Sequence, residues 1–145
     1  MFQLTLENER GKQIVLHPST QYVVTNIQGL TPPTATINSS VVALQDGEVY
    51  NSARVNTRNI VISVKPQPDV EKNRIALYDV AKTKHWCKLY FKSDTRNVYI
   101  EGYIESVDGS LFEMSQEIQI SILCHHPYFV AMETIITEMS KTLNL

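Results

Sequence analysis

The sequence is poor in the residues and spacings that build most catalytic and metal sites. Two cysteines and four histidines occur in 145 residues, and no Cys-x-x-Cys or His-Glu-x-x-His spacing groups them. The five glycines are scattered singly, which argues against a glycine-rich phosphate loop, and no Gly-x-Ser-x-Gly turn is present. We therefore expect a protein that is not an enzyme, with no cofactor and no metal ligands.

Long hydrophobic stretches and strong charge are also missing. No apolar run approaches the length of a membrane span, so we expect no membrane association. The N-terminal "MFQLTLENER" is acidic early and lacks an apolar signal core, which favours folding inside a cell. A net charge of −2 indicates no general polyanion-binding surface, and two cysteines do not make a disulfide framework. The length of 145 residues suits one domain with a core of its own.

The pattern that dominates the chain is alternation of apolar and polar residues, which is typical of half-buried strands. In residues 58–66, for example, Ile60, Ile62 and Val64 share one face. These runs predict a mainly β fold of the α+β kind, an antiparallel β-sandwich or barrel-like domain over residues 1–127. Further runs of this kind occur at 2–6, 13–17, 22–27, 34–37, 41–44, 87–91, 96–106 and 111–126.

Tight turns are predicted where aspartate is followed by glycine. Asp46-Gly47 comes shortly after the apolar run at 41–44. Asp108-Gly109 lies between the run that ends at 106 and the next expected strand. In that next strand, Phe112 and Met114 should face the core together with the later isoleucines.

One helix is predicted over 69–84 and packs on the β domain, with Asp69 as its N-cap. Lys82 and Lys84 fall at its expected end, where cations suit the helix dipole. The last stretch, 128–143, also carries a helical stripe, so a C-terminal helix is expected there. The inward face of the first helix is predicted from its three-to-four spacing to be Val70, Arg74, Leu77, Tyr78 and Ala81.

The segment "CHHPYF", residues 124–129, places a cysteine, two histidines and two aromatic residues in one run. Strand alternation turns Cys124 toward the core and His125 away from it, so they cannot pair as thiolate and imidazole on one face. His126 shares the face of Cys124 but precedes Pro127, where the strand should end. We interpret Cys124 as a buried inert thiol and both histidines as loop residues. A metal or hydrolase site at Cys124 is the weakest alternative.

The strand expected over 96–106 carries tyrosines and glutamates on its polar face. Paired carboxylates there suit acid–base chemistry, and tyrosines suit base stacking, but no basic residues cluster around them. A solvated or interface-facing strand explains this face better, and an interface is a candidate because aromatic residues are favoured at interfaces. The basic residues Lys82 and Lys84 are expected on the opposite side of such an interface. The residues of the tyrosine-bearing face are Tyr99, Glu101, Tyr103 and Glu105.

Five segments in a fixed order give the sequence a family resemblance. With the single helix between the second and third of them, they resemble the N-terminal, ring-forming half of the distal tail protein family of long-tailed bacteriophages (siphophage tail components). The segments are "IQGLTPP" (27–33), "DGEVYNSARVNTRNIVISV" (46–64), "LYFKSDTRNVYIEGYIES" (89–106), "LFEMSQEIQISILCHHPYF" (111–129) and "METIITEMSKTLNL" (132–145). The positions that match the family pattern are Asp46, Gly47, Arg58, Asn59, Ile60, Arg96, Gly102, Tyr103, Phe112, Cys124, Pro127, Tyr128 and Phe129.

The resemblance implies a structural role in the virion of a phage or prophage. Family members form a cyclic ring, expected here to be a hexamer, that joins the tail tube to the adsorption apparatus or baseplate. The implied partners are further copies of the chain, the tail tube protein, and tail-tip, receptor-binding or tail-associated proteins. DNA would only pass through the channel. The implied location is the tail tip, after assembly in the cytoplasm of the bacterial host.

The sequence departs from the family at its C-terminal side. Family members usually continue into a second, carbohydrate-module-like β domain, whereas this sequence stops at Leu145. Residues 128–145 are therefore expected to be an exit segment toward a domain that is absent here, and sugar or receptor binding is not carried over. A carbohydrate-binding or other recognition module is the alternative function, since β-sandwiches host such sites readily. A groove lined by Trp86 and tyrosines would favour it.

Overall fold

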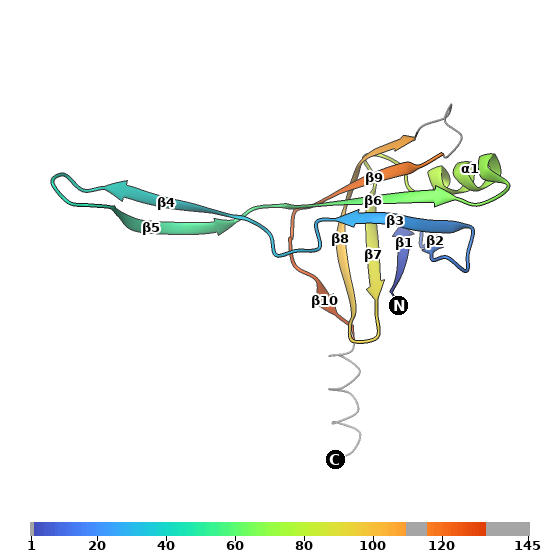
Figure 1. Ribbon diagram of the computed structural model, residues 1–145, viewed down its shortest axis with the longest axis horizontal. Coiled ribbons are helices and arrows are strands. Elements are labelled where there is room, and N and C mark those ends of the chain that lie inside the picture. The colour runs from blue at the N-terminus through green and yellow to red at the C-terminus, as the bar shows by residue number, and fades with distance from the viewer. Residues whose placement is uncertain (1, 110–115, 133–145) are drawn as a thin grey trace, which may run out of the picture.

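The computed structural model describes residues 2–109 and 116–132, and β-strands make up most of this part of the chain (Figure 1). Within these ranges one helix, α1 (Val70–Val80), interrupts the strands. The predicted mainly β fold with one helix is thereby confirmed. In chain order the strands are β1 (Gln3–Asn8), β2 (Gln13–Leu16), β3 (Tyr22–Gln28), β4 (Ala35–Val41), β5 (Glu48–Val55), β6 (Arg58–Pro66), β7 (Trp86–Lys92), β8 (Asn97–Gly109), β9 (Ile118–Cys124) and β10 (Val130–Ala131).

One antiparallel sheet forms the body of the protein. Its strand order is β2-β1-β7-β8-β9-β6-β3, with β10 also paired to β8. Strands far apart in sequence are neighbours in it, because β1 pairs with β7 and β6 lies between β9 and β3. An isolated antiparallel bridge between His17 and Tyr22 joins the end of β2 to the start of β3. The two ends of the strand order meet at this bridge, so the sheet curves into a barrel-like body.

The inward face of the curved sheet holds the hydrophobic core. Ile60, Ile62 and Val64 on β6 have no exposed surface, which confirms the face predicted for this strand. Full burial of one such side chain contributes about 1.5–3 kcal/mol, so the core easily outweighs the exposed polar contacts. The largest fully buried side chains are Leu4, Leu6, Leu16, Ile60, Ile62, Leu77, Leu89, Ile100, Ile104, Ile118, Ile120 and Ile122.

Helix α1 packs beside β1, β2 and β6, but it is shorter than the predicted 69–84. It ends at Val80, so Lys82 and Lys84 follow the helix and do not form its last turn. Asp69 holds the N-cap position, yet its side chain makes no capping hydrogen bond. The N-cap position of Asp69 is therefore confirmed without a side-chain capping bond, and the predicted basic last turn is wrong. Helix α1 is stabilised instead by its packing against the core.

The buried face of α1 also differs from the prediction, and Asn73 is the reason. This amide is 8% exposed, and its Nδ2 donates to the carbonyls of Gln67 and Pro68 at 3.0 and 3.3 Å. Nδ2 also donates to Gln21 Oε1 at 3.2 Å, and the Asn73 carbonyl accepts from the Tyr22 hydroxyl at 2.8 Å. A polar residue fits this buried site because its donors are satisfied. Leu77 and Ala81 are buried as predicted and Val80 joins them, whereas Val70, Arg74 and Tyr78 are half-buried.

The tight turn predicted at Asp108-Gly109 is wrong. Both residues belong to β8, where they pair with Gln119 and Ile118 of β9. Strand pairing continues through them because the first two residues of β9, Ile118 and Gln119, supply a partner for each. The connection to β9 passes through residues 110–115, so Phe112 and Met114, predicted to face the core, lie outside the described residues.

The tight turn predicted at Asp46-Gly47 is part of a longer connection, and β5, which follows it, was not predicted as a strand. Strand β4 ends at Val41 and β5 begins at Glu48, so residues 42–47 form a longer loop. Most of the run 41–44, expected to be a strand, therefore belongs to this loop. Gly47 has a φ of 78°, a conformation that favours glycine.

Residues 130 and 131 form the short strand β10, where a helix was expected from 128. They pair with Tyr99 and Val98 of β8, and the Met132 N–H donates to the Asn97 carbonyl at 2.9 Å. The rest of the helix predicted to residue 143 lies outside the described residues. Across residues 2–109 and 116–132, no helix combines the length and apolar character that a membrane crossing requires.

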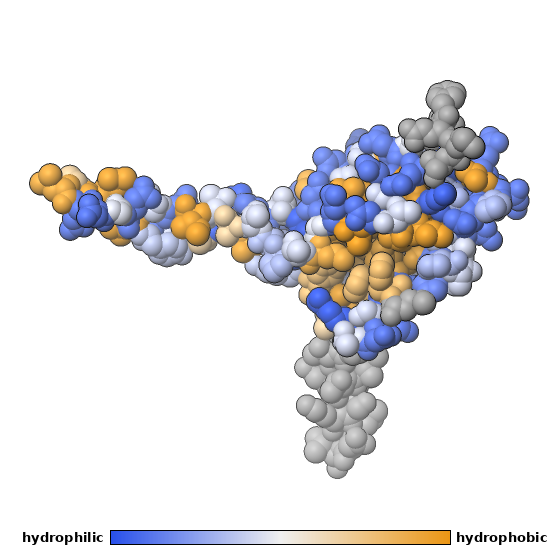
Figure 2. Space-filling model, viewed as in Figure 1, coloured by the Kyte–Doolittle hydropathy of each residue, from blue (hydrophilic) through white to orange (hydrophobic). Residues whose placement is uncertain are grey.

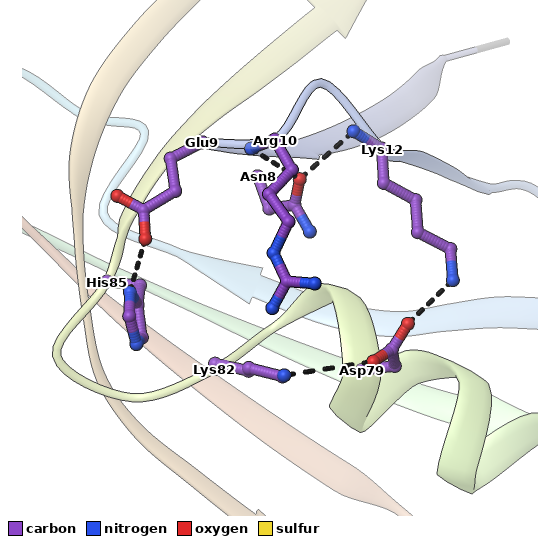
Figure 3. Close-up of polar contacts among 7 residues, drawn as sticks. All are labelled: Asn8, Glu9, Arg10, Lys12, Asp79, Lys82 and His85. Carbon is purple, nitrogen blue, oxygen red and sulfur yellow. Dashed lines mark hydrogen bonds and ion pairs between the residues drawn. The ribbon is translucent and has the colours of Figure 1, made fainter.

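Polar contacts tie the β1–β2 turn to the helix (Figure 3). Asn8 Oδ1 accepts from the backbone N–H groups of Arg10 and Lys12, each at 3.0 Å. Lys12 Nζ donates to Asp79 Oδ2 at 2.6 Å, and this bond holds the pKa of the Asp79 carboxyl below its usual range. Lys82 Nζ approaches the other Asp79 oxygen at 3.8 Å. These ion pairs are exposed, so they orient the turn more than they stabilise the fold.

Candidate assembly surface on the projecting hairpin

The hairpin formed by β4 and β5 projects away from the body as an arm (Figure 1). We use "arm" for residues 35–55, which include the connecting loop 42–47. Every residue of both strands is exposed. A two-stranded hairpin on its own is marginally stable in water. The arm would therefore gain stability from contact with a partner.

The two faces of the arm differ in chemistry. Strand pairing places Ala35 opposite Val55, Ile37 opposite Ala53, Ser39 opposite Tyr50 and Val41 opposite Glu48, all on one face. We call this the apolar face. Ile37, Val41 and Tyr50 on it are 65%, 73% and 65% exposed. Its polar members satisfy one another, because Ser39 Oγ donates to Glu48 Oε2 at 2.7 Å.

The opposite face of the arm is polar, and its side chains pair within the arm. Strand pairing puts Thr36 opposite Arg54, Asn38 opposite Ser52 and Ser40 opposite Val49 on this side. Asn38 Nδ2 donates to Ser52 Oγ at 3.1 Å, and Asn51 Nδ2 donates to Ser40 Oγ. This face is suited to water. The apolar face is not suited to contact with water, so it is the stronger candidate for an interface.

The tip of the arm is also hydrophobic. Leu44 lies in the loop 42–47, fully exposed and with a φ of 66°, which is uncommon for a residue other than glycine. Figure 2 shows hydrophobic side chains along the arm and at its end. A large exposed leucine in a left-handed conformation adds to the apolar surface that the arm presents.

The arm joins the body through two segments that pack closely on each other. We call residues 29–34 and 56–58 the arm root. The Asn56 N–H donates to the Thr34 carbonyl at 2.9 Å, which closes the base of the hairpin. Arg58 Nη1 donates to the carbonyls of Gly29 and Thr31 at 2.7 and 2.9 Å. The arm is thus held at its base by backbone and side-chain hydrogen bonds.

The interface residues predicted on β8 face outward, although the four are not equally accessible. Glu101 and Glu105 are exposed, and Tyr103 is 50% exposed. Tyr99 is half-buried, and Lys88 Nζ lies 4.1 Å from its ring centroid. The face predicted from alternation is therefore present, while its use as an interface stays a prediction.

The predicted basic partners lie beside β8 and not on the far side of the molecule. The Lys84 N–H donates to the Ile104 carbonyl at 2.8 Å, and the Ile104 N–H donates to the His85 carbonyl at 3.1 Å. The imidazole of His85 in turn contacts the carboxylate of Glu9 (Figure 3). Lys82 contacts Asp79 on the helix side of this segment. Lys82 and Lys84 therefore belong to the segment that adjoins β8 at Ile104, and their use as an interface stays a prediction.

A short aromatic row crosses the outward face of the sheet next to these residues. Trp86 on β7 pairs with Tyr103 on β8, which pairs with Leu123 on β9. The His125 ring meets Tyr103 edge-on, with centroids 6.1 Å apart. Trp86 and Leu123 are half-buried. Of Trp86, Tyr103 and Leu123 only Tyr103 is exposed, so this row is less accessible than the apolar face of the arm.

In the segment "CHHPYF", Cys124 and His125 have the orientations predicted from alternation. Cys124 has no exposed surface and is a free thiol, while His125 and His126 are exposed beyond the end of β9. Pro127 is buried, and its carbonyl accepts from Arg58 Nε at 2.8 Å. In the described ranges, no group of three or more His, Cys, Asp or Glu residues is placed to hold a metal ion.

The two buried thiols should resist modification in the folded protein. Burial raises the pKa of Cys87 to about 12 and that of Cys124 to about 11. At pH 8 a thiol with such a pKa is thiolate in about one molecule in a thousand or fewer, and the thiolate is the nucleophile. We expect Ellman's reagent to leave both cysteines unmodified in the native protein and to modify both in denaturant. An exposed cysteine introduced as Ser19→Cys is the control, and rapid native reaction of Cys124 would contradict its burial.

Two functional features escaped the sequence analysis. The runs 34–37 and 41–44 were expected to be ordinary half-buried strands, and no strand was predicted over 48–55. Both β4 (ATINSSV) and β5 (EVYNSARV) carry few large apolar residues. That shortage of core-forming side chains is the signal that separates them from β6 (RNIVISVKP). Arg58 was recognised as a family position, but nothing in its neighbourhood in sequence indicates that it is buried at 7% exposure.

Comparison with known proteins identifies solved structures that have a similar fold. No family model matches the chain, and no curated protein sequence matches it. Among solved structures, the SPP1 Dit protein (gp 19.1), described as a paradigm of hub adsorption apparatus in Gram-positive infecting phages, matches with a TM-score of 0.64 and 12% identity over 88% of this chain and 52% of that chain. A chain of the phage P2 baseplate in its activated conformation matches with a TM-score of 0.61 and 14% identity over 84% of this chain and 44% of that one. The chain spans about half the length of these two proteins and has the fold that they share.

Proposed function

We propose that this chain is a structural component of a phage tail tip or baseplate, and that its copies assemble into a ring through the arm. The ring would join the tail tube to the adsorption apparatus, with the tail tube protein and tail-tip proteins as its partners. The observation that carries the proposal is the arm itself, which has a water-suited polar face and an exposed apolar face. The likeness in fold to hub and baseplate proteins supports the same setting.

The geometry favours a head-to-tail contact between copies. The apolar face lies on a thin two-stranded projection, whereas the rest of the molecule is a rounded body (Figure 1). An arm that packs on the body of the next copy joins two different surfaces, and such a contact repeats around an axis until it closes. Two arms packed on each other would instead give a closed dimer. The proposal therefore predicts a cyclic assembly of more than two copies.

Sedimentation velocity across a wide concentration range, with electron microscopy of concentrated protein, tests this proposal. The expected result is a single large species with a central hole and the arm at every junction. A dimer that does not grow with concentration would contradict the ring. If the chain stays monomeric when concentrated, the decisive sample is a tail particle that carries this protein, and absence of the ring there would overturn the proposal.

The recognition-module alternative rests on the row of Trp86, Tyr103 and Leu123. An aromatic row on a sheet face is a common platform for sugar rings, because apolar ring faces stack on aromatic side chains. A glycan array with the wild-type chain and a Trp86→Ala variant separates the two functions. Binding that is lost in the variant would favour recognition, whereas no binding together with ring assembly supports the structural role.

A further inference from the structure

A buried arginine sits where the arm meets the body. Arg58 is the first residue of β6 and follows the last residue of β5 by three positions. It is 7% exposed, although charged residues are rarely buried without partners. A buried guanidinium must have its donors satisfied, so its partners reveal which parts of the chain it holds together.

The partners of Arg58 come from two separate segments. Nη1 donates to the carbonyls of Gly29 and Thr31, in the segment that connects β3 to the arm, at 2.7 and 2.9 Å. Nε donates to the carbonyl of Pro127, beyond the end of β9, at 2.8 Å. The guanidinium carbon lies 5.0 Å from the ring centroid of Phe129 in the same segment. One side chain thus contacts both the arm root and residues 127–129.

These contacts satisfy the charge of Arg58 and also fix the relative positions of the groups that it contacts. The planar guanidinium presents its donors in a rigid fork, so the three carbonyls are held at a set spacing. Hydrogen bonds from a charged donor are among the stronger ones in proteins. A lysine in this place would offer a single point charge at the end of a flexible stem, and it cannot bridge both segments in the same way.

The arm root has little freedom to move independently of Arg58. Gly29 has a φ of 93°, and a Cβ built on it would lie 2.1 Å from the Asn59 carbonyl oxygen. The two backbones are therefore in direct contact one residue beyond Arg58. With the Asn56–Thr34 hydrogen bond at the base of the hairpin, the root behaves as one packed unit.

We propose that Arg58 is a positioning residue that couples the direction of the arm to the placement of residues 127–132. A partner that fixes one of these elements then also restricts the other, and by thermodynamic linkage the effect is reciprocal. Under the proposed function, the coupling would link the surface where copies of the chain meet to residues 127–132, which lead toward the C-terminal side. It is a property of the single chain and does not depend on whether the ring forms.

Hydrogen exchange followed by mass spectrometry tests the coupling in the monomeric chain. Arg58→Met removes the donors at similar side-chain length, and exchange should rise about tenfold or more in both 28–34 and 126–131, with β7 and the centre of β8 unchanged. Arg54→Met, which removes an arginine from the exposed arm, is the matched control and should change neither segment. Arg58→Lys should protect at most one segment.

A double-mutant cycle separates coupling from simple stabilisation. Phe129→Ala alone should speed exchange at 29–31, although Phe129 is in the other segment, and should add little once Arg58 is methionine. Additive effects, a change confined to one segment, or a uniform rise across the whole sheet would each overturn the proposal. If Arg58→Met does not fold, Arg58→Lys with Phe129→Ala provides the same cycle.

Discussion

Replacing Ile37 with aspartate should abolish self-association of the chain and leave its free energy of unfolding almost unchanged. Ile37 is 65% exposed in the single chain, so the body does not depend on it. In an assembled interface its burial would contribute about 1.5–3 kcal/mol, and a buried unpaired carboxylate would add a further penalty. We expect the affinity at each junction to fall by about 100-fold or more, since about 1.4 kcal/mol is a factor of ten.

The neighbouring residue provides the control for this prediction. Thr36→Asp places the same charge one position away, on the polar face of the same strand. It should change assembly little, because that side chain points away from the apolar face. Sedimentation velocity reads out assembly, and urea denaturation reads out stability. Equal losses of assembly in both variants would show that charge on the arm matters and that the apolar face does not.

Much of the fold could be predicted because strand geometry constrains alternate residues strongly. A residue on a half-buried strand faces either the core or water, and a shift of one position exchanges the two. Cys124 and His125 illustrate this, since alternation alone placed the thiol inside and the imidazole outside. The outward orientation of Glu101 and Glu105 follows from the same rule.

The strand order and the ends of the elements could not be predicted, because they depend on contacts between distant segments. Strand β8 runs through Asp108 and Gly109 because β9 supplies partners for both, and this outweighs the local turn preference. Helix α1 turns Asn73 inward because Gln21 and Tyr22 lie there to meet its polar groups. Neither partner is close to Asn73 in sequence.

The candidate site was harder to predict than the fold, for a different physical reason. An arm that leaves the body still obeys strand alternation, so its pattern resembles that of a half-buried strand. Its shortage of large apolar residues is a weak signal in the sequence, because the exposure of both faces is a property of the tertiary arrangement. Arg58 is similar, because its burial is determined by carbonyls from Gly29 and Pro127, which are 29 and 69 positions away along the chain.

Replacing Gly29 with alanine should destabilise the body strongly. Gly29 has a φ of 93°, a backbone region that costs an L-residue other than glycine about 1–2 kcal/mol. The new Cβ would in addition lie 2.1 Å from the Asn59 carbonyl oxygen and 3.0 Å from its carbon. These are backbone atoms of a paired strand and cannot rotate aside, so β3 and β6 must separate locally. We expect a total loss of at least about 3–4 kcal/mol, near the upper end for single substitutions.

Gly11→Ala isolates the contribution of that contact. Gly11 has a similar φ of 82°, but a Cβ there would meet nothing within 4 Å. Both variants therefore carry the backbone cost, and only Gly29→Ala carries the steric one. Urea denaturation of the two should differ by at least about 2 kcal/mol, with equal dependence on denaturant if both unfold in two states. Equal losses would mean that the backbone of β6 can yield at Asn59, and the arm root would then be less tightly packed than its hydrogen bonds indicate.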